Sequence, residues 1–358
     1  MSDPTVNFQK IDLRGASDRE YEALGKFKNI MNKEYMPDDP PMPLEERIQD
    51  WKNIPAFVEL DSYVGWDAAQ SEIVAYCDIG IEHTDSNEHI AFFRIELLPA
   101  YRCQGLGRQM LGMLLPFAKE HHRSLLMIWM NDRVPAASIF LERMGGRRGQ
   151  EGRMNQLKVS ELDRDLIARW RQQSAHLESE FEMGLWEGAL PDEHIQEIAA
   201  LLQELANDQP RDALEIEDMK FTPEMIRQIE QNMLATGEVR WTLYVLDRSN
   251  QRLVGWTEVY WNANRPMILN QGFTAVDETY RNKGVGRWLK AAMMEKILQD
   301  RPQVEFIRTR NANSNAPMLK LNNEMGFKPY HAITAWQINT EQVENYLNNR
   351  AENQRTQQ

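Results

Sequence analysis

Polar and apolar residues follow two rhythms along this chain, one typical of strands and one typical of amphipathic helices. Period-two or continuous apolar runs predict strands at 57–60, 72–81, 90–98, 124–130 and 154–159, and later at 241–246, 252–260, 268–276 and 303–308. Apolar residues three or four positions apart predict helices at 16–35, 44–51, 135–144, 190–205 and 316–325, with one more after each of two glycine-rich stretches. This mixture predicts an α/β protein.

The second half of the chain repeats the order of the first. Each half runs helix, loop, helix, then antiparallel strands, and then strand, glycine loop, helix, strand, helix and strand. We therefore expect a mixed, mostly antiparallel sheet flanked by helices, present twice in tandem. The expected boundaries are 1–159 for the first domain, 160–182 for a helical linker, 183–340 for the second domain and 341–358 for a polar tail.

The glycine loops are the most specific part of the repeat. Tyr101–Arg108 and Tyr280–Arg287 both read Tyr-Arg-x-x-Gly-x-Gly-Arg, and their first glycines are 284 − 105 = 179 residues apart. Each loop stands between a strand and the start of a helix. Free backbone N–H groups and the helix dipole favour an anion at such a turn. Arg281, Lys283 and Arg287 add full positive charges to the second copy.

Three kinds of glycine loop bind phosphates, and two of them do not match. A P-loop needs a Gly-Lys-Ser/Thr ending that neither copy has. A dinucleotide fingerprint needs a third glycine where Met110 and Leu289 stand. The remaining Arg-x-x-Gly-x-Gly pattern resembles the pyrophosphate loop of the GNAT superfamily of N-acetyltransferases. Residues 311–327 are similar to the last helix of tandem members of the mycothiol synthase type, although nothing in the sequence indicates mycothiol itself.

This resemblance implies that both loops bind acetyl-CoA. In the second half it assigns coenzyme contacts to Arg281, Asn282, Lys283, Gly284, Val285, Gly286, Arg287 and Asn315, and pantetheine contacts to Thr274, Ala275 and Val276. In the first half it assigns them to Arg102, Cys103, Gln104, Gly105, Leu106, Gly107 and Arg108, with pantetheine contacts at Ile95, Glu96 and Leu97. The implied reaction is acyl transfer from a thioester to an amine, which needs a base and a group that stabilises the departing thiolate.

The thiolate-stabilising position departs from the family pattern. Many members carry a tyrosine four residues before the glycine that ends the last helix, but this chain has Leu141 and Asn322 there. Asparagine can donate a hydrogen bond and leucine cannot. We therefore expect the second half to be the catalytic one, with Asn322 as a catalytic residue, although Asn322 could equally bond locally within its helix. The first half would then bind acetyl-CoA without turnover.

Candidate acceptor-side residues lie on a strand and on a loop of the second half. Glu258 on the strand 252–260 is the candidate base, and the alternative is a solvated strand glutamate. Asp208 and Asp212 lie on the loop expected to cover the acceptor and could bind a cationic substrate, unless they are ordinary loop acids. Trp256 could line the acceptor pocket or belong to the core.

Composition limits the classes of partner and cofactor that we expect. Lys+Arg 41 against Asp+Glu 54 gives a net charge of −13, which counts against nucleic acid and anionic membranes and mildly favours an amine substrate. Two cysteines and no metal-spaced histidines indicate neither a disulfide framework nor a metal site. Without a leader-like N-terminus or a long apolar span, we expect a cytoplasmic protein, monomeric or homodimeric.

These observations lead to one expected function and two alternatives. The expectation is an acetyl-CoA-dependent N-acetyltransferase acting on the amine of a small molecule. A non-catalytic acyl-CoA-binding protein is the first alternative, favoured by the absence of the tyrosine in both halves. An acetyltransferase acting on a protein or peptide amine is the second, and it would need an open, elongated groove.

Overall fold

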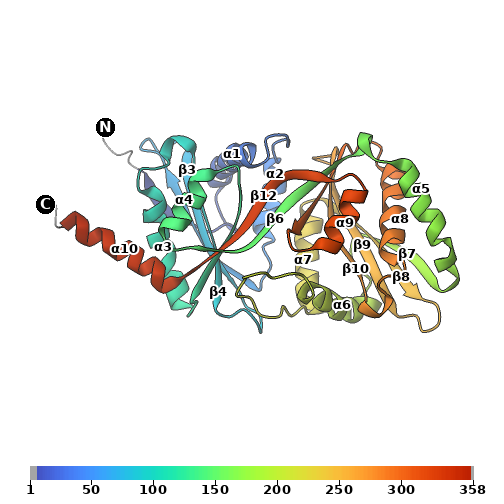
Figure 1. The fold of residues 1–358 in the computed structure, drawn as a ribbon. Helices are drawn as coiled ribbons and strands as arrows, with labels where there is room; N and C mark the ends of the chain where they lie inside the picture. Colours follow the sequence, from blue (N-terminus) through green and yellow to red (C-terminus); the bar gives the residue numbers. More distant parts are fainter. Residues whose placement is uncertain (1–5, 356–358) are drawn as a thin grey trace. The chain divides into compact units, whose positions relative to one another are not determined.

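The computed structural model describes residues 6–355, which divide into two compact units. Unit 1 comprises Met1–Glu151, Arg211–Asp218 and Ile333–Gln358. Unit 2 comprises Gly152–Pro210 and Met219–Ala332. Each unit has its own set of strands and its own hydrophobic core, as expected of a tandem α/β protein (Figure 1).

The strands of unit 1 follow the order β1-β2-β3-β4-β5-β12. Its strands are β1 (Asn7–Ile11), β2 (Val58–Trp66), β3 (Ile73–Glu82), β4 (Ile90–Leu97), β5 (Leu125–Asn131) and the later part of β12 (Lys328–Asn339). Its helices are α1 (Asp18–Tyr35), α2 (Leu44–Lys52), α3 (Leu106–Glu120), α4 (Pro135–Arg143) and α10 (Thr340–Arg355). Alternate residues of β3 bury against α1 and α2 on one face and against α3 and α4 on the other, so both faces are covered.

The strands of unit 2 follow the order β6-β11-β10-β9-β8-β7. Its strands are β6 (Arg147–Lys158, from Gly152 on), β7 (Phe181–Glu187), β8 (Glu238–Asp247), β9 (Leu253–Asn262), β10 (Ile268–Val276) and β11 (Phe306–Ala312). Its helices are α5 (Arg164–Ser174), α6 (Ile195–Asn207), α7 (Pro223–Ala235), α8 (Val285–Asp300) and α9 (Ala316–Glu324). Short 3-10 turns lie at Pro99–Tyr101, Val159–Glu161, Ala175–Ser179, Asp192–His194 and Glu278–Tyr280.

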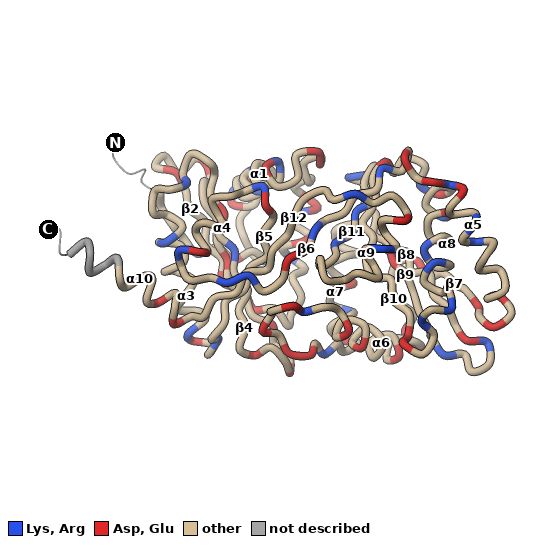
Figure 2. Tube along the Cα trace, in the orientation of Figure 1, with Lys and Arg blue, Asp and Glu red and all other residues tan. Residues whose placement is uncertain are grey.

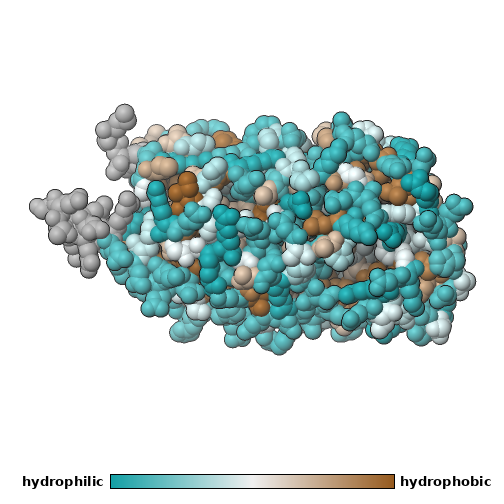
Figure 3. All heavy atoms as spheres, viewed as in Figure 1, coloured by the Kyte–Doolittle hydropathy of each residue, from teal (hydrophilic) through white to brown (hydrophobic). Residues whose placement is uncertain are grey.

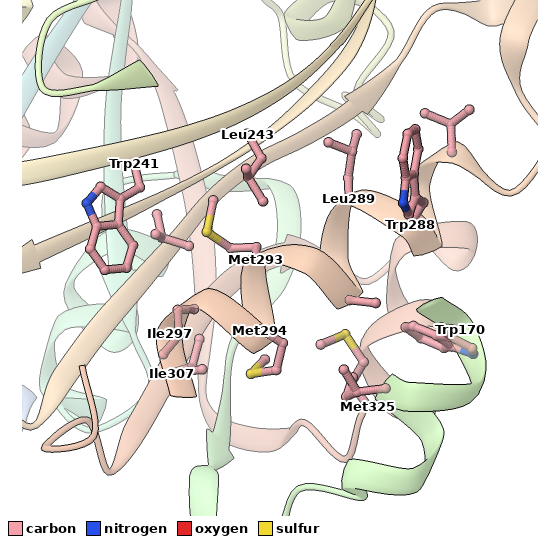
Figure 4. Packing of buried hydrophobic residues seen from close by; sticks show 14 of the residues in the cluster. Trp170, Trp241, Leu243, Trp288, Leu289, Met293, Met294, Ile297, Ile307 and Met325 are labelled. Atoms are coloured by element: carbon pink, nitrogen blue, oxygen red, sulfur yellow. The ribbon is translucent and has the colours of Figure 1, made fainter. Parts of the chain in front are cut away.

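Helix α8 occupies the centre of the unit 2 core. Figure 4 shows Leu289 and Met293 of this helix turned toward the sheet and Trp170 of α5 on its other side. Because the sheet and α5 cover it from both sides, α8 is apolar around much of its circumference. Helices α6 and α7 pack on the opposite face of the sheet with Trp256.

Each unit is completed by a strand from the other half of the chain. Strand β6 pairs antiparallel with β11, and β12 pairs antiparallel with β5. Helix α5 follows β6 into unit 2 and α10 follows β12 into unit 1. The units therefore differ from the expected sequential domains 1–159 and 183–340, and the expected linker is part of unit 2. Apolar periodicity locates a strand but does not choose its partner, which explains the difference.

Two further expectations differ from the structure. The expected polar tail forms α10 as far as Arg355, and Val343 in it is fully buried, whereas 356–358 lie outside the described residues. Strands β1 and β7 were not expected. Both are at an edge of a sheet, where few positions need apolar residues, so their alternation is weak.

The surface is mixed in charge. Figure 2 shows acidic and basic residues interspersed along both units, and the face drawn in Figure 3 is mostly hydrophilic with small hydrophobic patches. Among residues 6–355, no helix combines the length and apolar character needed to cross a membrane.

Candidate coenzyme loops and active site

The parallel strand pair of each unit is short and then opens. Strands β4 and β5 pair only from Ile90 to Phe92 on β4, and β10 and β11 pair only from Ile268 to Asn270 on β10. Beyond these points the rest of β4 and β10 has no parallel ladder, so its backbone groups can pair with an extended ligand. The glycine loop follows directly after this open stretch in both units.

The two loops share one backbone conformation. Cys103 and Gly105 have φ of 61° and 84°, and the matching Asn282 and Gly284 have φ of 64° and 96°. Helices α3 and α8 begin at the residue after each glycine. Left-handed residues next to a helix N-terminus turn successive N–H groups toward one point and form a site for an anion. The strand–loop–helix placement inferred from the sequence is confirmed.

Space above the loop glycines differs slightly between the units. A Cβ atom at Gly105 would meet nothing within 4 Å, and one at Gly284 would have Leu177 Cδ1 as its nearest neighbour at 3.9 Å. A ligand can therefore approach the backbone closely at both positions.

The first arginine of each loop ties the loop to the strand before it. The Nε of Arg102 donates to the carbonyl of Leu97 at 3.0 Å, and the Nε of Arg281 donates to the carbonyl of Val276 at 3.1 Å. The outer ends of both guanidinium groups bind carboxylates, Glu34 in unit 1 among them. These arginines hold the loop in place, and this engages donors that a phosphate could otherwise use.

Three residues expected at the second site have structural partners or lie elsewhere. Asp208 forms an ion pair with Arg281 at 2.6 Å. Asn315 caps α9 and donates to Gln209 Oε1 at 3.0 Å. Asp212 belongs to unit 1, because the 211–218 segment packs there. The structure does not bring Asp208 and Asp212 together, and their substrate-binding role stays a prediction.

A cavity of about 380 Å³ opens beside the loop of unit 1. Residues expected to bind the coenzyme line it: Ile95, Leu97, Arg102, Cys103, Gly105, Gly107 and Arg108. Ile128 and Met130 of β5 and Leu141 of α4 complete its walls. Mostly apolar walls that end at an anion-binding loop match the chemistry of a pantetheine arm joined to a pyrophosphate.

A second cavity, of about 170 Å³, lies in unit 2 and contains the candidate base. Glu258 and Trp256 line it, together with Arg240, Tyr260 and Phe273. The structure thus brings together the two acceptor-side residues expected on β9. This cavity lies on the side of the sheet that α6 and α7 cover, away from α8.

Glu258 is buried and hydrogen-bonded. Its side chain accepts a hydrogen bond from the backbone N–H of Phe273 at 3.3 Å and another from Tyr260. Burial raises the pKa of the Glu258 carboxyl above its usual range, and Arg240 and the two hydrogen bonds oppose this increase. A carboxylate whose pKa is raised accepts a proton more readily than an ordinary exposed one, which suits a general base.

A β-bulge in β10 places the backbone next to Glu258. The pairing of β10 with β9 shifts register between Gln271 and Thr274, whereas β4 pairs with β3 through six consecutive residues. A Cβ on Gly272 would lie 2.7 Å from Glu258 Oε1, so only glycine permits this approach. Bulges redirect backbone N–H groups and are common beside active sites.

Asn322 occupies an interior position rather than an open one. It is 1% exposed, and its Nδ2 donates to Asn311 Oδ1 at 2.9 Å. Leu141, at the matching position of unit 1, is also buried and lines the unit 1 cavity. The expected role of Asn322 with the thiolate stays a prediction. Its hydrogen bond joins α9 to Asn311 on β11 and is not the bond within its own helix that was the alternative.

Sequence reasoning did not identify Tyr260, Arg240 and Phe273. Tyr260 stands two residues after Glu258 on one strand, so the period of two could have placed both on the same face. Arg240 is held by Glu230 on α7, a pairing that no local pattern indicates.

Unit 1 carries a matching carboxylate. Counting along β3 and β9 from their pairs with the last residues of β4 and β10, Asp78 takes the position of Glu258. Tyr76 donates to Asp78 at 2.7 Å, and a buried ion pair joins Lys28 to Glu96 on the same side of the sheet. Burial lowers the pKa of Lys28 to about 8.

Comparison with known proteins agrees with this geometry. The family model described as "Acetyltransferase (GNAT) family" matches residues 25–145 and 200–327, one segment in each half and together most of the chain. No curated protein matches the sequence.

Solved structures show the same fold at low sequence identity. A tandem GNAT protein from the clavulanic acid biosynthesis pathway has a TM-score of 0.75 at 19% identity, over 94% of this chain and 99% of that one. A GCN5-related N-acetyltransferase from Sphaerobacter thermophilus has a TM-score of 0.62 at 13% identity, over 93% and 96%. A glucosamine N-acetyltransferase region of a fungal multi-domain β-N-acetylglucosaminidase has a TM-score of 0.62 at 12% identity, over 93% and 38%. The chain belongs to the acetyltransferase (GNAT) family, with two copies of the fold in tandem.

Proposed function

We propose that this protein is an acetyl-CoA-dependent N-acetyltransferase that acts on the amine of a small molecule, with turnover in unit 2. The observation that carries the proposal is the position of Glu258 at the bulge of β10. The Glu258 cavity lies on the α6–α7 side of the sheet, and the glycine loop leads into α8 on the other side. Two substrates could therefore approach the bulge from opposite faces.

The glycine loop of unit 2 and the open end of β10 fit the coenzyme. The N–H groups from Asn282 to Arg287 would hold a pyrophosphate, and the open end of β10 from Thr274 to Val276 would pair with a pantetheine arm. Acetyl-CoA supplies an acetyl thioester. In the reaction a C–N bond forms and the C–S bond breaks, and the proton lost by the attacking nitrogen ends on the departing sulfur to give the free thiol.

Glu258 acts as the general base. An amine attacks only when neutral, and the ionised Glu258 carboxylate can take the proton that the ammonium form must lose. Tyr260, hydrogen-bonded to this carboxyl, orients it. Trp256 and Phe273 supply apolar walls, and the cavity of about 170 Å³ favours a small or slender amine.

A non-catalytic acyl-CoA-binding protein is the second candidate. It is favoured by Leu141 and by Asn322, since one cannot donate a hydrogen bond and the other donates to Asn311. Such a protein would bind the coenzyme without releasing thiol.

Thiol release on an acceptor panel separates the candidates. The unaltered protein and Glu258→Gln would be incubated with acetyl-CoA and small amines, and with a lysine-containing peptide, while free thiol is followed. We expect amine-dependent release from the unaltered protein only. Release with the peptide alone would favour a protein acetyltransferase. Coenzyme binding without release on any acceptor would favour the acyl-CoA-binding protein, and no coenzyme binding at all would contradict both.

A further inference from the structure

Helix α10 is a fixed part of unit 1 and packs along α3, beside which it lies in Figure 1. Val343 is fully buried in the same core cluster as Leu114 of α3. Glu344 forms an ion pair with Lys119 at 2.5 Å. These contacts hold one face of α10 in place next to the glycine loop at the start of α3.

The last arginine of the unit 1 loop is bound to this helix. Arg108 donates to the carbonyl of Leu347, and its guanidinium carbon lies 5.7 Å from the ring centroid of Tyr346. The ring of Tyr346 also meets Phe140 of α4 edge-on, at 6.5 Å between centroids. Tyr346 therefore stands where the loop, α4 and α10 meet.

Two cavities share Tyr346 and Arg143. The first is the cavity of about 380 Å³ beside the glycine loop. The second, of about 400 Å³, lies between the end of α4 and α10 and is lined by Arg143, Met144, Gly145, Gln342, Asn345, Tyr346 and Asn349. A ligand that leaves the loop past Tyr346 enters a space lined by amides and one guanidinium group.

The side chains at this place suit a nucleotide. Tyr346 offers an aromatic face to a base, and the amides of Asn345 and Asn349 can both donate and accept hydrogen bonds. Arg143 forms no hydrogen bond or ion pair with the residues that the structure describes, so its guanidinium is available to a phosphate. This combination differs from the apolar walls of the first cavity.

We propose that the 3′-phosphoadenosine end of coenzyme A binds in unit 1 between α4 and α10, with the base against Tyr346 and the 3′-phosphate at Arg143. The inference rests on the proposed function, since it takes the ligand of the loop to be acetyl-CoA. Helix α10, from the second half of the chain, thus completes the coenzyme site of unit 1.

The matching position of unit 2 carries a carboxylate where unit 1 has a guanidinium group. Its last loop arginine, Arg287, lies 5.5 Å from the ring centroid of Trp170 on α5, the helix that packs on α8. Trp170 is only 4% exposed and lies among core residues in Figure 4. Glu324 ends α9 as Arg143 ends α4, and it binds Arg287 at 3.0 Å. A carboxylate at this position is less suited to a phosphate than the guanidinium group of Arg143, so we assign the nucleotide site to unit 1.

Calorimetric titration with truncated ligands tests this site. Coenzyme A, 3′-dephospho-coenzyme A and 4′-phosphopantetheine would be titrated into the unaltered protein, Arg143→Gln, Tyr346→Ala and Tyr346→Phe. The nucleotide contacts should make the unit 1 site the tighter of the two coenzyme A sites. We expect Arg143→Gln to weaken coenzyme A binding at this site about tenfold and to leave the affinity for 3′-dephospho-coenzyme A unchanged. Tyr346→Ala should weaken both nucleotides about tenfold but not 4′-phosphopantetheine, and Tyr346→Phe should restore their binding.

A matched control and the ligand series keep the outcomes separate. Arg148→Gln changes an exposed arginine of unit 1 that pairs with Glu151 at 2.9 Å and lines neither cavity, so it should leave all three affinities unchanged. Equal affinity of the unaltered protein for coenzyme A and 3′-dephospho-coenzyme A would overturn the inference without any variant. A Tyr346→Ala protein with unchanged affinities would overturn it as well. If the unaltered protein bound no coenzyme, the proposed function would fail first and this inference with it.

Discussion

Glu258 and Phe273 meet across two strands, with the carboxylate of one accepting a hydrogen bond from the backbone N–H of the other at 3.3 Å. This contact exists because β10 carries a bulge at this level, which turns an N–H group out of the regular ladder. The matching strand β4 of unit 1 keeps a continuous register. The candidate catalytic centre therefore differs between the units in backbone geometry as well as in side chains.

Replacing Glu258 by glutamine should remove the base while keeping the shape of the side chain. We expect kcat/KM to fall by about 10²- to 10⁴-fold, the usual contribution of a general base. In the unaltered protein, activity should rise with pH as Glu258 ionises, through a pKa above the ordinary value of 4.5 because burial disfavours the charged form. A pH–rate profile of Glu258→Gln that keeps both the rate and this limb would contradict the assignment.

Gly272→Ala tests whether the bulge needs a residue without a side chain. The added Cβ would lie 2.7 Å from both Glu258 Oε1 and Tyr260 Cε2, so one of the strands must move. We expect a loss of about 1–3 kcal/mol in the free energy of unfolding, measured by denaturant titration, and a lower rate of thiol release. The control is Gly112→Ala on α3, where the nearest atom is Leu347 Cδ1 at 3.9 Å and no loss is expected. Equal behaviour of the two variants would refute the steric requirement.

Lys290 is a buried ammonium in the core helix α8. It is 3% exposed and pairs with no other described residue, and burial lowers its pKa to about 8. Its folded-state pKa lies below the ordinary 10.5, so the unfolded chain holds more protons between these values and stability should rise with pH there.

The residue 290 − 179 = 111 of the first half is a leucine, which suggests the substitution. We expect Lys290→Leu to raise the free energy of unfolding at pH 7 by about 3 kcal/mol and to flatten its rise from pH 8 to 10.5. Denaturant titrations at several pH values measure both effects. An unchanged pH dependence in the variant would show that Lys290 does not cause it.

The exchanged strands predict that neither half is complete alone. A fragment of residues 1–159 lacks the strand and helix that close unit 1, and 160–358 lacks the β6 strand of unit 2. We expect each fragment, expressed separately, to be poorly folded and the two together to form one stable complex on size-exclusion chromatography. Two independently folded, monomeric fragments would contradict the exchange.

The sequence predicted what short segments determine by themselves. Both glycine loops could be placed because their motif, preceding strand and following helix are contiguous, and Glu258 could be named because it lies among apolar strand residues. The exchange of β6 and β12 depends on pairings between distant segments. The sequence predicts Asp208 as a loop acid that could bind substrate, but it cannot show the pairing of Asp208 with Arg281, 73 residues away. The raised pKa of Glu258 likewise depends on burial that only the packed fold creates.

Blocking each glycine loop in turn shows which of the two loops turnover requires. Gly105→Trp and Gly284→Trp each place a large side chain where a ligand would approach the backbone, and each would be assayed for thiol release with an accepted amine beside the unaltered protein. We expect Gly284→Trp to abolish release and Gly105→Trp to retain it, while each variant loses one of two acetyl-CoA sites by calorimetry. Loss of release only in Gly105→Trp would contradict the assignment of turnover to unit 2.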